Sequence, residues 1–349
     1  MKRKPLKILV FFVMIVFVSC DEPETVVTDI IHRDGSVTRE ILMRKSDNKF
    51  KITDIQVPLD NSWTISDSCE ISSKGDTTWV KRASKVFKNA DEINLAYKTD
   101  TGCNSKLSRY AGFSKRFRWF NTIYRFSETI EKRMKYGYPV SNFLNSEELK
   151  WFYSPNSDNK SKLNGQDSLR YKAVSDSVNI KKDKWINKCI VSEWIGEFSG
   201  QLNNRDVKLS YDSLKSNEGR ILDVVMRSEK DFDNLWTSGY ILKEFIGESN
   251  ALKYRTEADT ALKIVEDRVT ESFAGYSVRI SMPGILTASN GFADSSKVLI
   301  WPVTDEYFFT DNYEMWAESK EPNLWAWITS GAFVLFVLAG VIIRKYKRG

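Results

Sequence analysis

The 349-residue sequence contains a single histidine, His32, and this shortage excludes most of the common catalytic machinery. A Ser–His–Asp triad or a Cys–His pair would have to use that one residue, which stands beside an Asp-Gly turn where we expect it to be exposed. The sequence also lacks a Gly-x-Ser-x-Gly elbow, a Walker phosphate loop, a His-Glu-x-x-His motif and any Cys-x-x-Cys pair. We therefore expect no enzymatic activity, no cofactor and no metal.

Paired carboxylates are the one catalytic chemistry that these absences leave open. Two acids held on either side of a glycosidic bond can hydrolyse it. Adjacent acids on a helix or turn, however, are normally solvated charge, and the sequence has three such pairs: Asp91 and Glu92, Glu147 and Glu148, and Asp305 and Glu306. A carboxylate-dependent envelope hydrolase is kept as an alternative, with no catalytic residue assigned.

Cysteine is also scarce, with four residues in the whole chain. Cys20 lies near the N-terminus, and the other three cysteines are an odd number, so at least one of them stays unpaired within the chain. Cys69 and Cys103 both fall in strand-and-loop sequence and are predicted to form a disulfide, which an exported protein permits. Cys189 falls on an apolar helical stripe and is predicted to be a buried free thiol.

One apolar stretch, residues 325–343, is long enough to span a bilayer. It contains no charged residue, and about 19 helical residues cover nearly the ~30 Å of a hydrocarbon core. Trp325 and Trp327 stand at one end, where aromatic rings favour the interface, and Arg344 and Lys345 follow the other end. Because basic residues stay on the cytoplasmic side, we predict a transmembrane helix at 324–343, a cytoplasmic tail at 344–349 and a chain that otherwise lies outside the cytoplasm.

The first twenty residues have the pattern of an export signal. A basic start is followed by an apolar segment, residues 8–18, that is too short to span a membrane. Val18, Ser19 and Cys20 then resemble the lipobox of bacterial lipoproteins, which implies removal of residues 1–19 and attachment of acyl chains such as palmitate to Cys20. Asp21 resembles an inner-membrane retention signal. An ordinary signal peptide and an uncleaved N-terminal anchor are the alternatives.

The formal net charge of +6 does not indicate a nucleic-acid-binding protein. Eight of the 52 basic residues lie in the signal segment and the tail, neither of which contains an acidic residue. Removing these eight leaves 44 basic against 46 acidic residues in the exported body, residues 20–323, a net charge of −2. Aromatic residues make up 13% of the sequence, so we expect this body to be folded.

Strand patterns stand at both ends of the exported body, and helical patterns fill about 141–273. Asp34 and Gly35 between two β-branched runs predict a hairpin. One helix is predicted over 232–246, and Asn145 and Thr256 are predicted helix N-caps. A last strand is expected at 307–315, before 318–323 leads into the membrane. We predict an α+β fold with one antiparallel sheet from the N- and C-terminal segments, a helical middle region and one C-terminal transmembrane helix.

Residues 113–126 form a stretch in which basic and aromatic side chains nearly alternate, and we predict one long strand. Nucleic acid or anionic lipid headgroups are ligands for such a pattern, which comprises Arg116, Phe117, Arg118, Trp119, Arg125 and Phe126. Export argues against nucleic acid. We prefer a strand whose arginines extend into solvent, and keep a lipid-headgroup site as the alternative.

A second resemblance covers about fifty residues near the C-terminus. Pro283-Gly284, Asn290-Gly291 and the Val298-to-Trp301 strand precede an apolar helix in an order that resembles the tail of LppM-type bacterial lipoproteins. The resemblance implies a lipid-tethered α+β domain, one form of which is a helix-grip fold that holds a ligand. This sequence departs from a simple helix-grip domain by its large helical middle. The rest of the body resembles exported lipoproteins of Bacteroidota, and that resemblance implies no activity.

Three functions remain from these observations. The double anchor and the missing catalytic set favour a non-enzymatic binding or structural module of the cell envelope, held in the inner membrane with its bulk in the periplasm. Its expected partners are the membrane and an envelope protein or lipid. The alternatives are a lipid- or small-ligand-binding domain, which predicts a deep apolar cavity, and the carboxylate hydrolase, which predicts two acids that face each other in a cleft.

Overall fold

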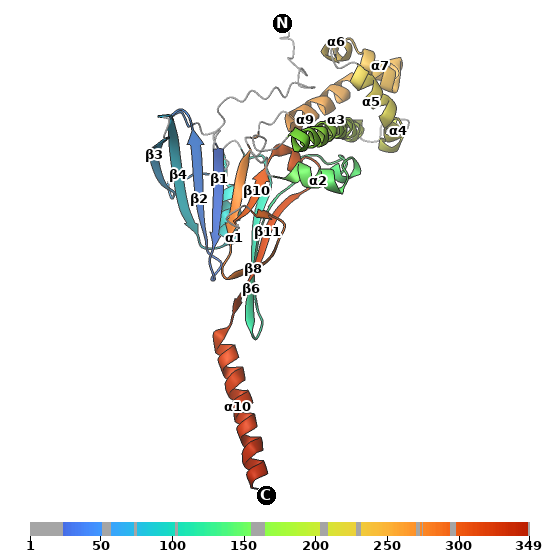
Figure 1. Ribbon diagram of the computed structural model, residues 1–349. Helices are drawn as coiled ribbons and strands as arrows, with labels where there is room; N and C mark the ends of the chain where they lie inside the picture. The colour runs from blue at the N-terminus through green and yellow to red at the C-terminus, as the bar shows by residue number, and fades with distance from the viewer. Residues whose placement is uncertain are drawn as a thin grey trace. The chain divides into compact units, whose positions relative to one another are not determined.

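The computed structural model describes residues 24–50, 57–72, 75–101, 104–154, 165–202, 209–227, 232–269, 273, 275–293 and 298–347. They belong to two units (Figure 1). A β-rich unit is formed from residues 23–130, 275–303 and 313–349, and a helical unit from 131–274 and 304–312. The predicted α+β class, with strands from both ends of the chain and helices between them, is confirmed.

The β-rich unit contains two sheets, where we predicted one. The larger sheet has the order β3-β4-β2-β1-β7-β10-β9. Its strands are β1 (Glu24–Ile31), β2 (Val37–Lys45), β3 (Thr64–Ile71), β4 (Thr77–Phe87), β7 (Tyr276–Ser281), β9 (Phe292–Ala293) and β10 (Leu299–Val303). Neighbouring strands are antiparallel except β1 and β7, which run parallel. A parallel pair needs a long crossover, and the chain between Ile31 at the end of β1 and Tyr276 at the start of β7 supplies it.

The smaller sheet is antiparallel and has the order β5-β6-β11-β8. Its strands are β5 (Arg109–Phe117), β6 (Asn121–Ile130), β8 (Ile285–Ser289) and β11 (Tyr313–Pro322). The strand predicted over 113–126 is therefore wrong: it is the β5–β6 hairpin, closed by hydrogen bonds between Arg118 and Asn121 in both directions. The alternation of the sequence continues through the turn, and no glycine or proline marks it.

Alternate residues of the central strands form the core of the β-rich unit. Val37, Ile41 and Met43 of β2 are buried, as are Tyr124 and Phe126 of β6. This spacing of two places one face of each strand inward. Every residue of β3 is exposed, as an edge strand permits.

Helix α1 (Ala90–Lys98) protects another edge of the β-rich unit. Asn89 caps its first turn by accepting a hydrogen bond from the Glu92 amide. The Asn94 side chain both donates to the carbonyl and accepts from the amide of Ala111 on β5, at 3.0 and 2.6 Å. Two backbone groups at the edge of the smaller sheet are satisfied in this way.

The helical unit is built around one long helix, α3 (Gly165–Leu202). The other helices are α2 (Ser146–Tyr153), α4 (Tyr211–Ser216), α5 (Glu218–Arg227), α6 (Phe232–Thr237), α7 (Tyr240–Ile246), α8 (Glu248–Lys253) and α9 (Arg255–Val269), with short 3-10 turns at Val140–Asn142 and Asp305–Phe308. Trp194 and Phe198 of α3 stack at 5.0 Å between ring centroids and form the centre of a buried apolar cluster. The predicted apolar stripe of this helix is thus core.

Two helix predictions fail and one is confirmed. The helix predicted over 232–246 is divided into α6 and α7 because Gly239 has a left-handed backbone, with φ of +78°. Thr256 lies inside α9 rather than at its N-cap, since α9 begins at Arg255, with Tyr254 as the one residue between it and α8. Asn145 does cap α2, in a capping box with Glu148.

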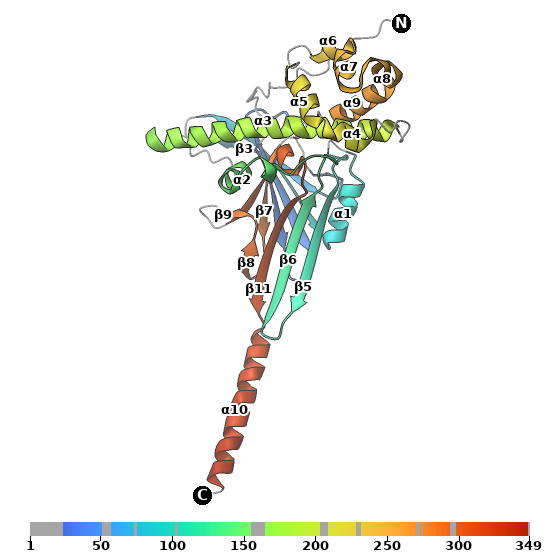
Figure 2. The same ribbon diagram turned by 90° about the vertical axis from the view of Figure 1, so that its right-hand side faces the viewer.

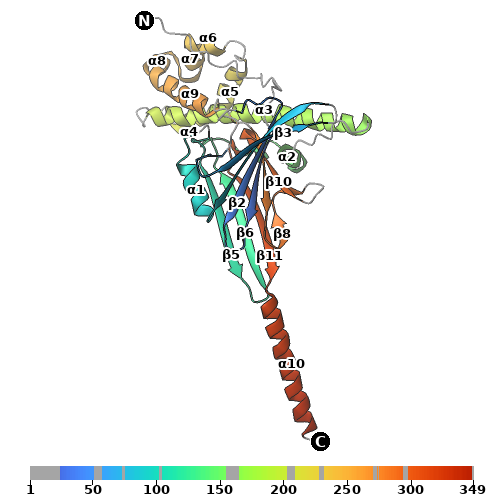
Figure 3. The ribbon, with the colours of Figure 1, turned by 90° about the vertical axis from the view of Figure 1, so that its left-hand side faces the viewer.

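Helix α10 (Leu324–Tyr346) follows β11 with Asn323 as the one intervening residue. A last strand is present before α10, but its predicted bounds of 307–315 are wrong, because β11 begins at Tyr313 and continues to Pro322, where we expected a loop into the membrane. Figures 2 and 3 show α10 continuing from the end of β11. Within the described part of the chain, α10 alone is long and apolar enough to cross a membrane, with a mean hydropathy of 2.3.

Candidate functional site

In each of the three acidic pairs that the sequence leaves as hydrolase candidates, at least one carboxylate has a structural role. Glu148 accepts hydrogen bonds from the Lys181 ammonium at 2.6 Å and from the Asn145 amide at 2.9 Å, and these bonds lower the pKa of Glu148. Glu306 forms an ion pair with Lys182 at 2.8 Å, although burial raises the pKa of this carboxyl. In this arrangement each carboxylate caps a helix or pairs with a lysine, as a structural acid does.

The third pair lies at the start of α1. Glu92 accepts a hydrogen bond from the Lys88 amide at 2.6 Å, and Asp91 stands in the same first helical turn. Negative charge is favourable there because the helix dipole is positive at its N-terminus. Across the described ranges, no three His, Cys, Asp or Glu side chains gather in a way that could hold a metal ion.

The cysteines are spread over different parts of the chain. Cys189 is buried, as predicted, and burial raises the pKa of its thiol to about 12. Cys69 is exposed on β3 and forms no disulfide with another described cysteine. Its predicted partner Cys103 and the predicted lipidation site Cys20 both lie outside the described residues. The Cys69–Cys103 disulfide and the lipidation of Cys20 therefore stay predictions.

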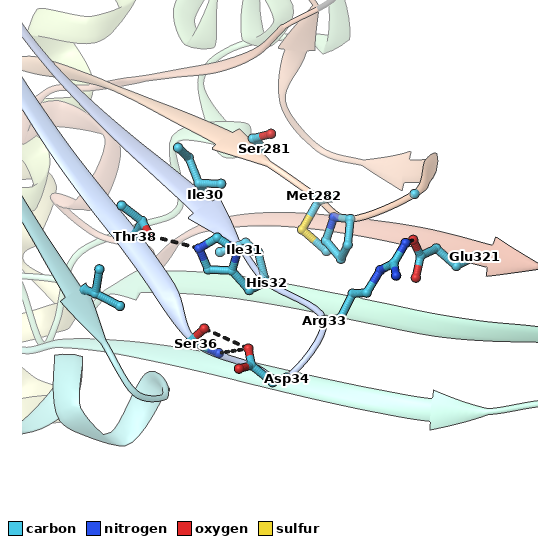
Figure 4. Close-up of a pocket in the computed structure, with 13 residues that line it drawn as sticks. Ile30, Ile31, His32, Arg33, Asp34, Ser36, Thr38, Ser281, Met282 and Glu321 are labelled. Carbon is cyan, nitrogen blue, oxygen red and sulfur yellow. Dashed lines mark hydrogen bonds and ion pairs between the residues drawn. The ribbon is translucent and has the colours of Figure 1, made fainter.

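His32 lies in an open pocket of about 790 Å³ beside the β1–β2 turn (Figure 4). Its Nε2 is 2.8 Å from the Thr38 hydroxyl, and the ring is exposed, as predicted from the turn. Arg33 reaches across to Glu321 of β11, with 2.5 Å between nitrogen and oxygen. Asp34 is turned the other way, and hydrogen bonds from Ser36 lower the pKa of its carboxyl. The pocket is open and has a mixed polar and apolar lining, unlike the deep apolar cavity that a lipid-binding domain requires.

A buried charged network lies inside the β-rich unit, and sequence analysis missed it. Arg39 of β2 donates to Asp29 of β1 at 2.7 and 2.9 Å, to Glu128 of β6 at 2.8 Å, and to the hydroxyl of Tyr97 on α1. Both sheets and α1 are joined through this guanidinium. Burial raises the pKa of Asp29, an effect that Arg39 opposes. Since all four side chains are enclosed, the network stabilises the fold and offers no access to a ligand.

The helical unit contains a second network of buried polar groups. Glu193 on α3 accepts from the backbone amides of Lys135 and Tyr136 at 3.1 and 2.7 Å, and it pairs with Arg268 of α9. Nearby, Lys215 donates to Glu218 at 2.9 Å. These contacts fix the 131–138 segment on α3, and the carboxylates are occupied by backbone and basic partners.

The most distinctive arrangement is the junction between the β5–β6 turn and the start of α10. The Asn323 side chain donates to the carbonyls of Arg118 and Trp119 at 2.7 and 3.2 Å and accepts from the Thr122 hydroxyl at 2.8 Å. The Asn323 amide also donates to the Phe120 carbonyl at 2.9 Å. One asparagine thus satisfies most of the backbone acceptors of the turn.

Two tryptophans extend this junction along α10. Trp327 donates from its indole nitrogen to the Phe120 carbonyl at 3.2 Å, and Trp119 donates to the Ser330 hydroxyl at 2.9 Å. The turn is therefore attached to the first two turns of the helix as well as to the residue before it. Sequence analysis identified the arginines and aromatics of this stretch but placed them in a continuous strand, so it could not place them against α10.

Comparisons with known proteins provide no family. No protein-family model and no curated protein matches the sequence. Among solved structures, the NMR structure of the folded domain of LppM from Mycobacterium tuberculosis aligns with 92% of this chain and 97% of that domain, at 10% sequence identity and a TM-score of 0.25. LppM, whose type of tail the sequence resembles, is thus a weak structural neighbour, and nothing about its role is transferred at this level of similarity.

Proposed function

We propose that this chain is a membrane-anchored extracytoplasmic protein that acts as a non-enzymatic binding or structural module of the cell envelope. In this proposal α10 spans the inner membrane, the tail after Ile343 is cytoplasmic, and both units lie in the periplasm. A lipid on Cys20 supplies a second tether. A spanning helix is effectively permanent, whereas a single acyl chain attaches reversibly and a lipid anchor is stable only where several chains act together, as the acyl chains on Cys20 would. Retention rests first on α10.

The observation that carries the proposal is the one-residue connection between β11 and α10, reinforced by the β5–β6 turn. A flexible linker of Gly and Ser residues would let a folded unit move away from its anchor. Here Asn323 is bonded to three residues of the turn, so the β-rich unit is held at the end of the helix. Such a connection suits a module that works at a fixed position on the membrane.

The roles of the ionisable groups support a non-enzymatic module. His32 contacts Thr38 in an exposed turn, and Glu148 and Glu306 are paired with lysines. The alternative of a ligand-binding domain is less well supported, since the pocket beside His32 is open and its lining includes the charged side chains of Arg33, Asp34 and Glu321. The hydrolase alternative would require a pair of facing acids that the three predicted pairs do not supply.

The anchors are tested with four forms of the full chain: the parent, Cys20→Ala, a truncation after Asn323, and both changes together. We expect the parent and each single change to stay in the membrane fraction after carbonate washing, and the combined form to be released. Release of the truncated form alone would mean that Cys20 carries no lipid. Intact-mass measurement of the parent, tagged after Gly349, checks the lipid on Cys20 and the retained helix in one spectrum.

The non-enzymatic role is tested by complementation of an envelope phenotype in a deletion strain. Glu148→Gln, Glu306→Gln and Glu92→Gln are expected to complement as well as the parent at equal protein abundance. The truncation after Asn323 is expected to fail. A carboxylate variant that is folded and membrane-bound but fails to complement would contradict the proposal and favour the hydrolase.

A further inference from the structure

Five aromatic side chains gather where the β5–β6 turn meets α10, and all of them are exposed. They form what we name the aromatic cluster: Phe117, Trp119, Phe120, Trp325 and Trp327, with exposed fractions of 58, 49, 38, 53 and 54%. Their rings contact one another across the junction. Phe120 and Trp327 have centroids 4.4 Å apart, and Trp119 meets Trp325 edge-on at 5.2 Å. A contiguous exposed apolar surface of this kind marks an interaction site.

The depth of the cluster along α10 indicates what covers it. Ser330, which accepts the hydrogen bond from Trp119, is six residues after Leu324, so it lies about 9 Å along the helix axis. The uncharged residues 324–343 cover ~30 Å as a helix, which matches the hydrocarbon core of a bilayer. If this segment spans the membrane, the tip of the turn reaches below the membrane surface. Tryptophan rings favour that interfacial layer.

The charges of the turn complement one kind of membrane surface. Residues 113–126 include four basic residues and no acidic one. Arg116 and Arg118 flank Phe117 and are exposed, with Arg116 60% exposed and 3.7 Å from Glu318 across the sheet. Basic side chains beside a membrane-embedded aromatic surface attract anionic lipid headgroups. Guanidinium groups bind phosphate oxygens particularly well because of their planar fork.

We propose that the β5–β6 turn is a second membrane-contact site, in which the aromatic cluster is embedded in the interface and Arg116 and Arg118 bind the phosphate groups of anionic lipids. This inference rests on the proposed membrane anchoring by α10. It adds a lipid partner for a part of the chain that is outside the spanning helix. The site holds the β-rich unit against the bilayer and fixes its rotation about α10, because the turn touches the membrane on one side of the helix.

The depth of the β5–β6 turn in the bilayer is measured on the full chain in liposomes whose lipids carry nitroxide groups, which quench a fluorophore that lies within the membrane. The background carries Cys69→Ser and Cys103→Ser, and an environment-sensitive fluorophore is attached at Phe120→Cys. Two matched exposed positions supply the references: Ile328→Cys on α10, and Ile71→Cys on β3, at the end of its sheet opposite to the β1–β2 turn. We expect the label at 120 to be quenched at least half as strongly as the label at 328, and the label at 71 to be unaffected.

The two references separate this inference from the proposed function. No lipid quenching at 328 would mean that α10 does not span the bilayer, and the proposed anchoring would fail. Quenching at 328 with a label at 120 that resembles the one at 71 would overturn the second contact alone, and would leave a protein as the partner of the aromatic cluster.

Headgroup recognition is measured with the unlabelled full chain in nanodiscs with equal anionic and zwitterionic lipid. Arg116→Gln with Arg118→Gln is compared with Arg44→Gln and Arg82→Gln, two partly exposed arginines of the larger sheet. We expect the turn variant to retain at least twofold fewer anionic lipids by native mass spectrometry, and the control variant to match the parent. Equal retention by the turn variant and the parent would refute the arginines as headgroup ligands.

Discussion

Replacement of Arg39 tests the main interaction that joins the two sheets. Its guanidinium is 1% exposed and is bonded to Asp29, Glu128 and Tyr97, which come from β1, β6 and α1. Arg39→Met keeps much of the apolar stem and removes the charge. The two carboxylates, Asp29 and Glu128, would then lie next to each other in the core with no cation between them.

The expected loss is large because an uncompensated charge is left behind. Breaking a buried ion pair by removing one partner costs about 3–5 kcal/mol. For a domain of this size, 1 kcal/mol corresponds to a shift of roughly 2–4 °C in the melting temperature. We therefore expect Arg39→Met to lower the melting temperature of the β-rich unit by roughly 8–16 °C, at about 4 kcal/mol.

The loss is expected to grow with pH. Burial already raises the pKa of Asp29 while Arg39 opposes it, so removing Arg39 raises the pKa further. A carboxyl whose pKa is higher in the folded state binds its proton more tightly there, so its stabilising effect is lost as pH rises above the ordinary aspartate range. The difference between the variant and the parent should be greater at pH 8 than at pH 5.

The measurement is thermal unfolding of the full chain in detergent, in which the loss of protease resistance of the β-rich unit with temperature gives its melting temperature. Arg82→Met is the matched control, because Arg82 is half-exposed and bonded to Ser68 and Glu70, and its loss should cost less than about 1 kcal/mol. Replacing Asp29, Arg39 and Glu128 together by Leu, Met and Leu should recover stability relative to Arg39→Met alone. An Arg39→Met protein that melts within 3 °C of the parent would refute the reasoning.

Three further predictions concern single groups. In the native protein, kept reduced with a phosphine, a maleimide should label Cys69 and leave Cys189 unmodified, since burial raises the pKa of the Cys189 thiol to about 12. Mass spectrometry before and after unfolding checks both sites, and rapid native labelling of Cys189 would contradict its burial. Burial and nearby aspartates raise the pKa of Glu266 to about 7, so the free energy of unfolding should fall as pH rises from about 4.5 to 7. Glu266→Gln should remove that decline and stabilise the protein by about 1 kcal/mol at pH 8, because the half-buried site then carries no charge. Urea unfolding at several pH values measures both. Asn323→Ala should increase amide hydrogen exchange of residues 118–123 at least tenfold, while Asn94→Ala, which removes a comparable pair of backbone contacts on β5, should leave that segment unchanged.

The features that sequence analysis predicted correctly depend on a few neighbouring residues. Asp34 and Gly35 set the β1–β2 turn, where Gly35 has a φ of +93° and the ring of Phe113 lies so close that a Cβ would clash with it. Asn145 and Glu148 form a capping box within four residues. The apolar run of α10 is likewise contained in the segment itself. Each signal is local, so one sequence is enough to read it.

The features of the fold that could not be predicted from the sequence are pairings between distant strands. Strands β6 and β11 pair along their whole lengths although almost 200 residues separate them, and the parallel pairing of β1 with β7 crosses the helical middle. Alternation tells which face of a strand is buried and does not tell which strand lies beside it. Division of the strands into two sheets was therefore not predictable from the pattern.

The buried network did leave a signal in the sequence. Asp29 lies between Val27 and Ile31, and Arg39 between Val37 and Ile41, so both charged residues occupy the apolar face of their strands. Two opposite charges on the inward face of one predicted hairpin indicate a buried ion pair. Their register in the hairpin, Asp29 opposite Arg39, follows from the turn at Asp34 and Gly35. Glu128 and Tyr97, which come from other elements, had no such local indication.

The same distinction between local and non-local information applies to the junction between the β5–β6 turn and α10. The sequence places Trp325 and Trp327 at the start of an apolar helix, and it places Trp119 and Phe120 in a basic, aromatic stretch some 200 residues earlier. The pairing of β6 with β11 brings these two pairs of aromatic residues together, since Asn121 pairs with Pro322 at the end of the sheet. The aromatic cluster is therefore a product of the tertiary fold. A peptide of residues 324–349 would insert as a helix without that cluster, whereas the folded chain adds aromatic rings and guanidinium groups on one side of it, where the β5–β6 turn lies.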